Sequence, residues 1–312
     1  MLRGVAFGVT FEARVDDRRL LPAVRARLPP GWTVAVRAPA VVVSLVHEVS
    51  DTSRGTVGAP GRTGVPSARS RPVTGLSVRL DGQPVARGLS HAQALDVFES
   101  ELQLSVARLA RPEVFVHAGV VAVGGRAILV PGRSGAGKTT LVRALVEAGA
   151  TYYSDEYAVL DTAGRVHPYP RRPSVRVRGG HKERHPVPRG RGRTPVPVGL
   201  IVHTRYRKGA RWRLAPLSAG ECVLALLANT VPARDRPGEV LAALARATAG
   251  ARGFRGDRGP AGQTARALIA LARDLAPARD RRGPALSARG LRSGRGPRGP
   301  ARGSRRPPPR RR

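Results

Sequence analysis

Two hydrophobic periods run along the chain and together predict a mixed α/β protein. The first period is helical, and residues 90–111 carry its clearest apolar face, at Leu95, Phe98, Leu102, Val106 and Leu109. Ser90 precedes this stretch and Gln93 follows three residues later, a capping box that predicts the start of a helix. The same period predicts further helices at 18–28, 138–148, 218–229, 240–249 and 264–275.

The second period is that of strands, in short apolar runs bounded by turn-forming residues. We expect strands at 5–12, 32–37, 40–46, 76–80, 114–117, 120–123, 126–130, 150–154, 158–160, 165–166 and 198–204. Asp81-Gly82 and Gly124-Gly125 have the composition of two-residue hairpin turns, so the strands beside each pair are expected to be antiparallel. Pro84 has no amide hydrogen to donate, which predicts that its strand lies at a sheet edge.

Composition divides the chain into three parts. Residues 1–90 form a predicted small α/β domain, interrupted at 51–74 by a Gly-, Ser-, Arg- and Pro-rich stretch that we expect to be a flexible loop. Residues 91–276 contain most of the predicted elements and form the second domain. Residues 277–312 are rich in Arg, Pro and Gly, and this composition predicts a disordered tail.

The formal charge of +34 at pH 7 is high and is partly concentrated in the tail. Residues 277–312 contain 13 Arg and one Asp, a net charge of +12 that attracts polyanions non-specifically. Arginine is also scattered through the rest of the chain, which has only three lysines in all. A compositional bias towards Arg therefore explains the charge better than a dedicated nucleic-acid site.

Cysteine usage and hydropathy limit the cellular setting. Cys222 is the only cysteine, so the chain has no internal disulfide framework, and its apolar neighbours predict a buried, unreactive thiol. No apolar run approaches the ~20 residues that a bilayer span requires. The N-terminus also lacks the long apolar region of a secretory signal. We expect a cytoplasmic protein with no membrane partner.

Residues 132–139 carry the pattern G-x-x-x-x-G-K-T between an apolar run and a helical stretch. A strand that ends in a glycine turn and opens a helix directs backbone N–H groups and the positive end of the helix at phosphates. Lys138 is expected to reach the β- and γ-phosphates, and Thr139 to hold Mg²⁺. The sequence predicts an ATP and Mg²⁺ site with contacts from Gly132, Arg133, Ser134, Gly135, Ala136, Gly137, Lys138, Thr139 and Thr140.

An acidic pair, Asp155 and Glu156, follows Lys138 by 17 and 18 residues, at the end of the predicted strand 150–154. Phosphoryl transfer needs a carboxylate that holds Mg²⁺ and a group that orients the acceptor hydroxyl. We expect Asp155 to contact the metal and either acid to orient the acceptor. The alternative is an ordinary turn at a strand end.

Three segments together resemble the C-terminal catalytic domain of HPr serine kinase/phosphorylase, namely 116–121, 127–139 and 153–156. The resemblance implies a P-loop fold shared with ATP-dependent phosphoenolpyruvate carboxykinase, in which helices flank a mixed sheet. It also implies catalytic roles for His117, Lys138, Asp155 and Glu156, with Glu156 standing where the family has a second aspartate.

The chain lacks the later Glu-Ile-Arg-Gly and Pro-Gly-Arg-Asn segments of that family, so HPr as the substrate and a reverse phosphorylase activity are not implied. Its Ser-Asp-Glu-Tyr segment resembles stand-alone kinase relatives linked to modified-peptide biosynthesis. We expect an ATP-dependent kinase acting on a serine or other hydroxyl of a small protein or peptide. The alternatives are a non-catalytic ATP-binding regulator and a nucleic-acid-associated P-loop ATPase. A homo-oligomer is compatible with each.

Two weaker signals lie in the irregular segment 168–197. Arg171 and three further arginines before residue 179 could supply charge to a transition state, but a solvated basic loop is the favoured interpretation. His181 and His185 have a spacing found among metal ligands, but no helix is predicted to present them, and we expect no metal there.

Overall fold

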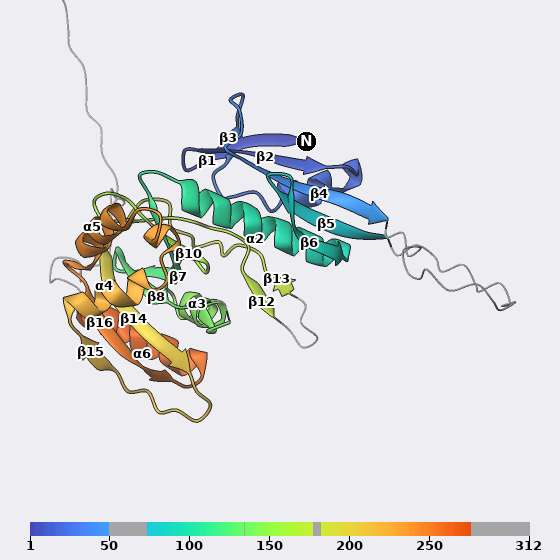
Figure 1. The fold of residues 1–312 in the computed structure, drawn as a ribbon. Coiled ribbons are helices and arrows are strands. Elements are labelled where there is room, and N and C mark those ends of the chain that lie inside the picture. Colours follow the sequence, from blue (N-terminus) through green and yellow to red (C-terminus); the bar gives the residue numbers. More distant parts are fainter. Residues whose placement is uncertain (50–73, 134, 177–181, 276–312) are drawn as a thin grey trace, which may run out of the picture. The chain divides into compact units, whose positions relative to one another are not determined.

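The computed structural model describes residues 1–49, 74–133, 135–176 and 182–275, which form a mixed α/β structure (Figure 1). Three predictions fall wholly or mainly outside these residues: the flexible loop at 51–74, the disordered tail at 277–312 and the phosphate contact from Ser134. Of the two histidines considered as metal ligands, His181 and His185, the first also lies outside the described residues. The fold class is confirmed at the level of a mixed α/β protein built on two mixed sheets.

The N-terminal sheet has the strand order β3-β1-β2-β4-β5-β6 within the described residues. Its strands are β1 (Leu2–Ala6), β2 (Val9–Val15), β3 (Thr33–Val34), β4 (Val41–Val49), β5 (Thr74–Leu80) and β6 (Gln83–Leu89). The single strand expected at 5–12 is instead two, because Phe7 and Gly8 take positive φ and turn the chain back on itself. Strand β6, which contains Pro84, lies at the sheet edge as predicted.

Helix α2 (His91–Leu109) covers the N-terminal sheet and begins at the predicted capping box. The Ser90 hydroxyl accepts from the Gln93 amide at 3.4 Å, and the Gln93 side chain accepts from the Ser90 amide at 3.0 Å. Phe98 and Leu102 are fully buried among strand residues, and each such side chain contributes about 1.5–3 kcal/mol. The helix expected at 18–28 is a short 3-10 turn, η1 (Arg18–Leu20), followed by α1 (Leu21–Arg25).

The second sheet runs β11-β10-β7-β8-β14-β16-β15, with β9 also paired to β7. Its strands are β7 (Val114–Val123), β8 (Arg126–Pro131), β9 (Thr151–Ser154), β10 (Tyr157–Leu160), β11 (Val166–His167), β14 (Val198–Tyr206), β15 (Ala215–Leu217) and β16 (Arg252–Arg258). The neighbours β8, β14 and β16 are parallel, whereas the remaining pairs are antiparallel. The mixed sheet is therefore confirmed. A separate ribbon pairs β12 (Ser174–Arg176) with β13 (Lys182–Arg184).

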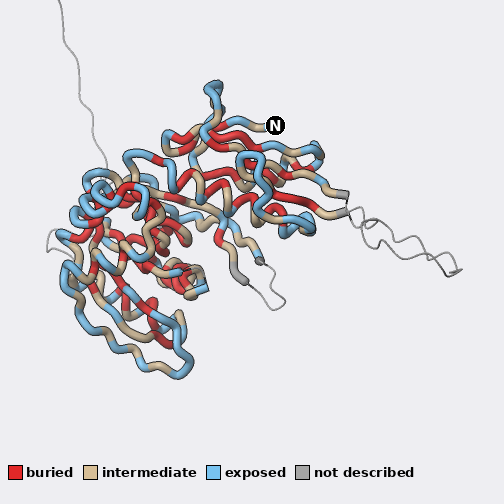
Figure 2. Tube along the Cα trace, in the orientation of Figure 1, coloured by how far each residue is buried: buried red, intermediate tan, exposed pale blue. Residues whose placement is uncertain are grey.

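Helices cover both faces of the second sheet. On one face, α3 (Lys138–Glu147) and α6 (Ala261–Asp274) pack with Ile128, Val130 and Val202. On the other, α4 (Ala219–Leu227) and α5 (Pro237–Thr248), with the 3-10 turn η2 (Val231–Ala233) between them, cover Leu129 and Ile201. Figure 2 shows the buried positions following the strands and the inner helix faces. Cys222 is buried on α4, as predicted, and burial raises the pKa of its thiol.

Strand β16 has no counterpart among the strands expected from the sequence. Its residues, Arg252–Arg258, read Arg-Gly-Phe-Arg-Gly-Asp-Arg and carry little apolar material. The glycines have a packing role, since a Cβ at Gly253 would lie 2.0 Å from the Cys222 sulfur and one at Gly256 would lie 2.1 Å from the Arg213 carbonyl oxygen. Neighbouring segments therefore approach this strand more closely than any side chain would allow.

One hydrophobic cluster joins α2 and the N-terminal sheet to Phe115, Tyr157 and Tyr169 of the second half. The Phe7 ring meets Phe115 edge to face with ring centroids 5.2 Å apart. The predicted domain boundary at residue 90 stays a prediction. Within the described residues, no helix combines the length and the apolar character needed to cross a bilayer.

The glycine at the centre of β16 yields a stability prediction. We expect Gly253→Ala to lower the free energy of unfolding by about 1–3 kcal/mol, because its methyl would overlap the buried Cys222 sulfur. Gly220→Ala is the control, since no atom lies within 4 Å of a Cβ there and alanine favours the helix by up to about 1 kcal/mol. Urea denaturation measures both, and equal effects would contradict the close packing of β16 on α4.

Candidate active site

The glycine turn follows β8 directly and leads into α3. The Gly132 amide donates to the His117 carbonyl at 3.2 Å, which extends the β7–β8 pairing by one step into the turn. Gly135 and Gly137 have φ of 86° and 78°, a left-handed conformation that side chains with a Cβ rarely adopt. Helix α3 then begins at Lys138 with Gly137 as its N-cap. The predicted strand–turn–helix arrangement is present.

Lys138 is folded into the turn rather than extended into solvent. Its ammonium donates to the carbonyl oxygens of Gly132 and Arg133 at 2.7 and 3.1 Å. Burial lowers the pKa of Lys138, although Glu156 and Asp155 oppose the shift. Among the described residues, Lys138 has no carboxylate within ion-pair distance. A buried cation without a direct counter-ion is suited to bind an anion such as phosphate.

Thr139 and Asp155 are in direct contact. The Thr139 hydroxyl donates to Asp155 Oδ2 at 3.0 Å, and the Tyr152 hydroxyl donates to Oδ1 at 3.2 Å. Asp155 is only 3% exposed, and this burial raises the pKa of its carboxyl group above the usual range. The predicted Mg²⁺ ligands thus lie side by side, although they come from α3 and from the turn between β9 and β10.

Glu156 lies beside His117 because β7 and β10 pair antiparallel, with His117 opposite Tyr157. The His117 Nδ1 is 3.7 Å from Glu156 Oε1, and both side chains are about one-third exposed. Burial, with a smaller contribution from Lys138, lowers the pKa of His117, while Glu156 opposes the shift. A neutral imidazole therefore stands next to a carboxylate at the mouth of the turn, and such a pair can accept a proton.

Arg171 connects this site to α2, and the structure corrects the solvated-loop interpretation for it. Its guanidinium lies 3.4 Å from Glu156 and 3.3 Å from Glu99, and its side chain is 12% exposed. The Arg171 carbonyl accepts from Tyr152 at 3.0 Å. Burial opposes the charge, but Glu99, Glu156 and Asp155 outweigh it and raise the pKa of Arg171. Arg171 therefore fixes the position of the Glu156 carboxylate through this ion pair.

Arg258 is a site residue that sequence reasoning missed. It ends β16 and donates to the carbonyl oxygens of Ala136 and Gly137 at 3.3 and 3.0 Å. The side chain is 3% exposed, and a Cβ at Gly137 would lie 2.6 Å from its guanidinium. Arg258 thus supports the glycine turn from the β16 side. No local signal marks this residue, because β16 itself has no apolar pattern.

The predicted ligands of Mg²⁺ fit that ion without forming a complete protein cage. Among the described parts of the chain, no group of three or more His, Cys, Asp or Glu side chains could hold a metal. Mg²⁺ is commonly bound by one or two carboxylates together with phosphate oxygens and water. Asp155 and the Thr139 hydroxyl would supply the protein's share. Thr140, also a predicted phosphate contact, is exposed on the first turn of α3.

Removing the Arg171 charge should destabilise the protein. Arg171→Met removes the buried cation that Glu99 and Glu156 share, although Glu99 keeps its contact with Arg184, and we expect a loss of about 1–3 kcal/mol in the free energy of unfolding. Arg172→Gln, at the exposed neighbouring position, should change it by less than about 0.5 kcal/mol. Denaturant titration of the two variants provides the comparison, and equally small effects would show that Arg171 carries no structural charge.

The raised pKa of Asp155 predicts a pH-dependent difference between the wild type and Asp155→Asn. Between the unfolded and folded pKa values the folded wild type binds more protons, so its stability falls as pH rises through that window. The amide variant lacks this loss. The unfolding free energy of Asp155→Asn relative to wild type should therefore increase from pH 3.5 to pH 7. A difference that is constant or falls with pH would contradict a raised pKa of this buried carboxyl.

Comparisons with known proteins leave the site to be interpreted from its own residues. No family model matches the chain, and no curated protein shows significant similarity to it.

Proposed function

We propose that this protein is an ATP-dependent kinase similar to HPr serine kinase, which transfers the γ-phosphoryl group of Mg-ATP to a hydroxyl of a small protein or peptide. One observation carries the proposal: the glycine turn presents buried Lys138 where Thr139 meets Asp155, with Glu156 and His117 beside them. Phosphate, metal and proton-accepting groups from β7, the start of α3 and the turn between β9 and β10 are thereby combined. A cytoplasmic location, where ATP is available, fits this activity.

The phosphate side of the site consists of the turn and its cation. Backbone N–H groups at the start of α3 and the Lys138 ammonium would hold the phosphates, while Thr139 and Asp155 would hold Mg²⁺. Bound Mg²⁺ supplies positive charge to the phosphate oxygens. The raised pKa of free Asp155 means that a cation beside it would also stabilise its ionised form.

The acceptor side of the site is the pair of Glu156 and His117. In the transfer, the acceptor oxygen bonds to the γ-phosphorus as the bond to the β–γ bridging oxygen breaks, and the hydroxyl proton passes to this pair. His117 is available to accept it because burial lowers the pKa of its imidazole and so keeps the ring neutral. Arg171 holds the Glu156 carboxylate at 3.4 Å and limits its movement.

A non-catalytic ATP-binding protein would use the turn in the same way but would need neither Glu156 nor His117. Incubation of the purified protein with γ-labelled Mg-ATP and cell extract distinguishes the two functions. A labelled protein or peptide acceptor supports the kinase, provided that Glu156→Gln abolishes the label while still binding Mg-ATP. Absence of any labelled acceptor, with Mg-ATP bound, would favour the regulator.

Loss of the Lys138 charge tests the phosphate site. We expect Lys138→Ala to reduce ATP turnover by at least ~100-fold, because a cation on the β- and γ-phosphates is lost in a buried site. Arg37→Ala removes an exposed cation from the N-terminal sheet region and should leave turnover unchanged. Turnover is followed by ADP release, and an unaffected rate in Lys138→Ala would refute the assignment of the turn.

A further inference from the structure

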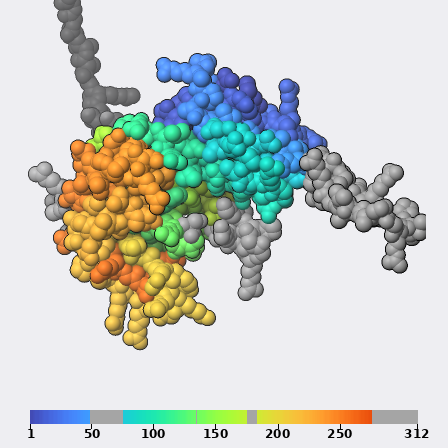
Figure 3. Space-filling view, in the orientation of Figure 1, coloured from blue at the N-terminus to red at the C-terminus, as the bar shows by residue number. Residues whose placement is uncertain are grey.

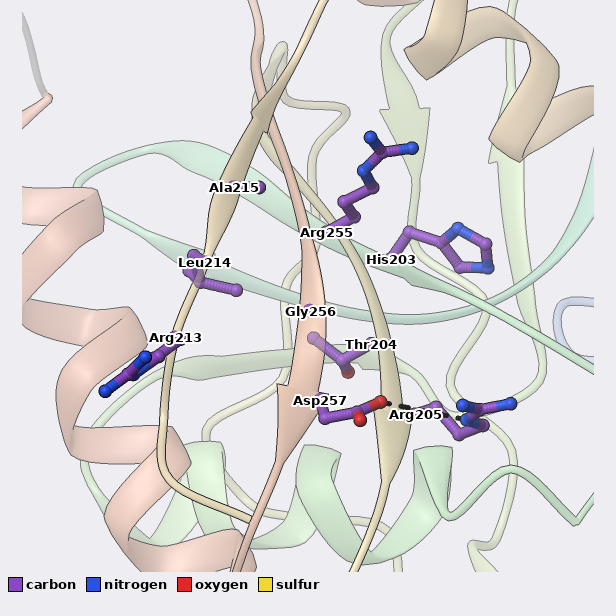
Figure 4. Close-up of a pocket in the computed structure, with 9 residues that line it drawn as sticks. All are labelled: His203, Thr204, Arg205, Arg213, Leu214, Ala215, Arg255, Gly256 and Asp257. Atoms are coloured by element: carbon purple, nitrogen blue, oxygen red, sulfur yellow. Dashed lines mark ion pairs between the residues drawn. The ribbon is translucent and has the colours of Figure 1, made fainter.

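A concave surface lies at the carboxyl ends of β14 and β16, the end of the sheet that also carries the glycine turn (Figure 4). Its volume is about 650 Å³, and its walls include His203 and Arg205 from β14 and Arg255 and Asp257 from β16. Arg213, from the segment before β15, completes the wall. This hollow does not contain the turn itself, and none of the roles assigned above uses it.

A second hollow of about 500 Å³ continues the first and shares Arg213 and Asp257 with it. We call the two together the basic groove, which carries the positive side chains Arg205, Arg207, Lys208, Arg211, Arg213 and Arg255, with His203 beside them. Two carboxylates contact these six Arg and Lys residues: Asp257 pairs with Arg205 at 3.7 Å and Arg207 at 3.2 Å, and Glu221 of α4 pairs with Arg255 at 3.5 Å. The groove therefore has a surplus of positive charge.

The positive side chains of the groove are available to a partner. Arg205 and Arg207 are 79% and 69% exposed despite their contact with Asp257. Figure 3 shows the yellow segment around residues 200–220 projecting long side chains from the surface. Exposed pairs of this kind contribute little to stability, so exchanging Asp257 for a stronger anionic partner costs little.

The strand register places the groove and the glycine turn at the same end of the second sheet. Ile201 of β14 pairs with Leu129 of β8, and the glycine turn begins three residues after Leu129. On the next strand, Asp257 and Arg258 point to opposite faces of the sheet. Arg258 holds the Ala136 and Gly137 carbonyls on the face of α3, whereas the groove opens on the face of α4, where Arg255 pairs with Glu221 at 3.5 Å. Ligands of parallel α/β sheets bind at the carboxyl ends of the strands. A chain lying in the groove would reach the phosphate turn by crossing the carboxyl ends of β14 and β8.

We propose that the basic groove binds an acidic segment of the phosphoryl acceptor, so that a hydroxyl on the same peptide reaches Glu156 and His117. This inference rests on the proposed kinase function. Carboxylate side chains match the surplus of guanidinium groups, which bind them in a planar, two-bond geometry. The only aromatic ring among the residues lining the two hollows is the His203 imidazole, which disfavours single-stranded nucleic acid because its successive bases need several rings to stack on.

The test compares two variants of equal charge change in the full-length protein. Arg205→Glu/Arg213→Glu reverses the groove, whereas Arg18→Glu/Arg37→Glu reverses two exposed positions of the N-terminal region. Fluorescence anisotropy measures binding of a labelled ten-residue peptide of Glu, Asp and Ser. We expect the groove variant to lose at least about tenfold in affinity and the control less than about threefold. Equal losses would overturn the proposal, because bulk charge would then explain binding.

Two further measurements separate the possible failures. Calorimetric binding of Mg-ATP should be the same in both variants and wild type, because neither touches the turn. If wild type binds Mg-ATP but not the acidic peptide, the groove assignment fails and the phosphate site stands. If it binds the peptide through the groove but not Mg-ATP, the kinase proposal fails and the groove stands. A labelled ten-nucleotide oligouridylate that loses more affinity than the peptide in the groove variant would overturn the peptide assignment in favour of nucleic acid.

Discussion

Helix α3 lies directly on the backbone of β7, and the candidate active site depends on that contact. A Cβ at Gly119 would lie 2.6 Å from a Val142 methyl and 3.7 Å from Lys138 Cβ, so only glycine permits this approach. The contact sets the first turn of α3 above β7, whose neighbour β10 carries Glu156 at its entrance. The close packing of α3 on β7 therefore brings together the site residues of three elements, namely Lys138, Thr139, Asp155 and His117.

The buried cation Arg171 links the candidate active site to α2. Arg171 contacts Glu156 of the site and Glu99 of α2, and Arg184 in turn reaches Asp96 of α2 at 2.8 Å. Burying these charges is costly, and a well-packed apolar cluster would stabilise the fold as effectively. We therefore interpret the role of this ion-pair network as positioning the Glu156 carboxylate and not as stabilising the fold. It gives the Glu156 carboxylate one defined direction, and it ties that direction to the helix that covers the N-terminal sheet.

The elements that carry strong local patterns could be predicted from the sequence. The capping box at Ser90, the Gly124-Gly125 hairpin and the strand–turn–helix around Lys138 all have local causes, and the structure contains each of them. Strand β16 could not be predicted, because its stability comes from neighbours packed against its glycines and not from its own side chains. Arg258 was missed with it. For Arg171 the expected solvated loop was wrong. Composition describes the average character of a segment, whereas the burial of this one side chain depends on its contacts with Glu99 and Glu156.

The central claim is that a triphosphate lies on the glycine turn, and calorimetric titration of the wild-type protein tests it most directly. We predict saturable binding of one Mg-ATP per chain, weakened when EDTA removes Mg²⁺ because Thr139 and Asp155 then lose the ion they share. Binding should also disappear in Lys138→Ala. A titration in which the folded protein releases no heat with Mg-ATP at any concentration, and shows no thermal stabilisation by it, would contradict the account.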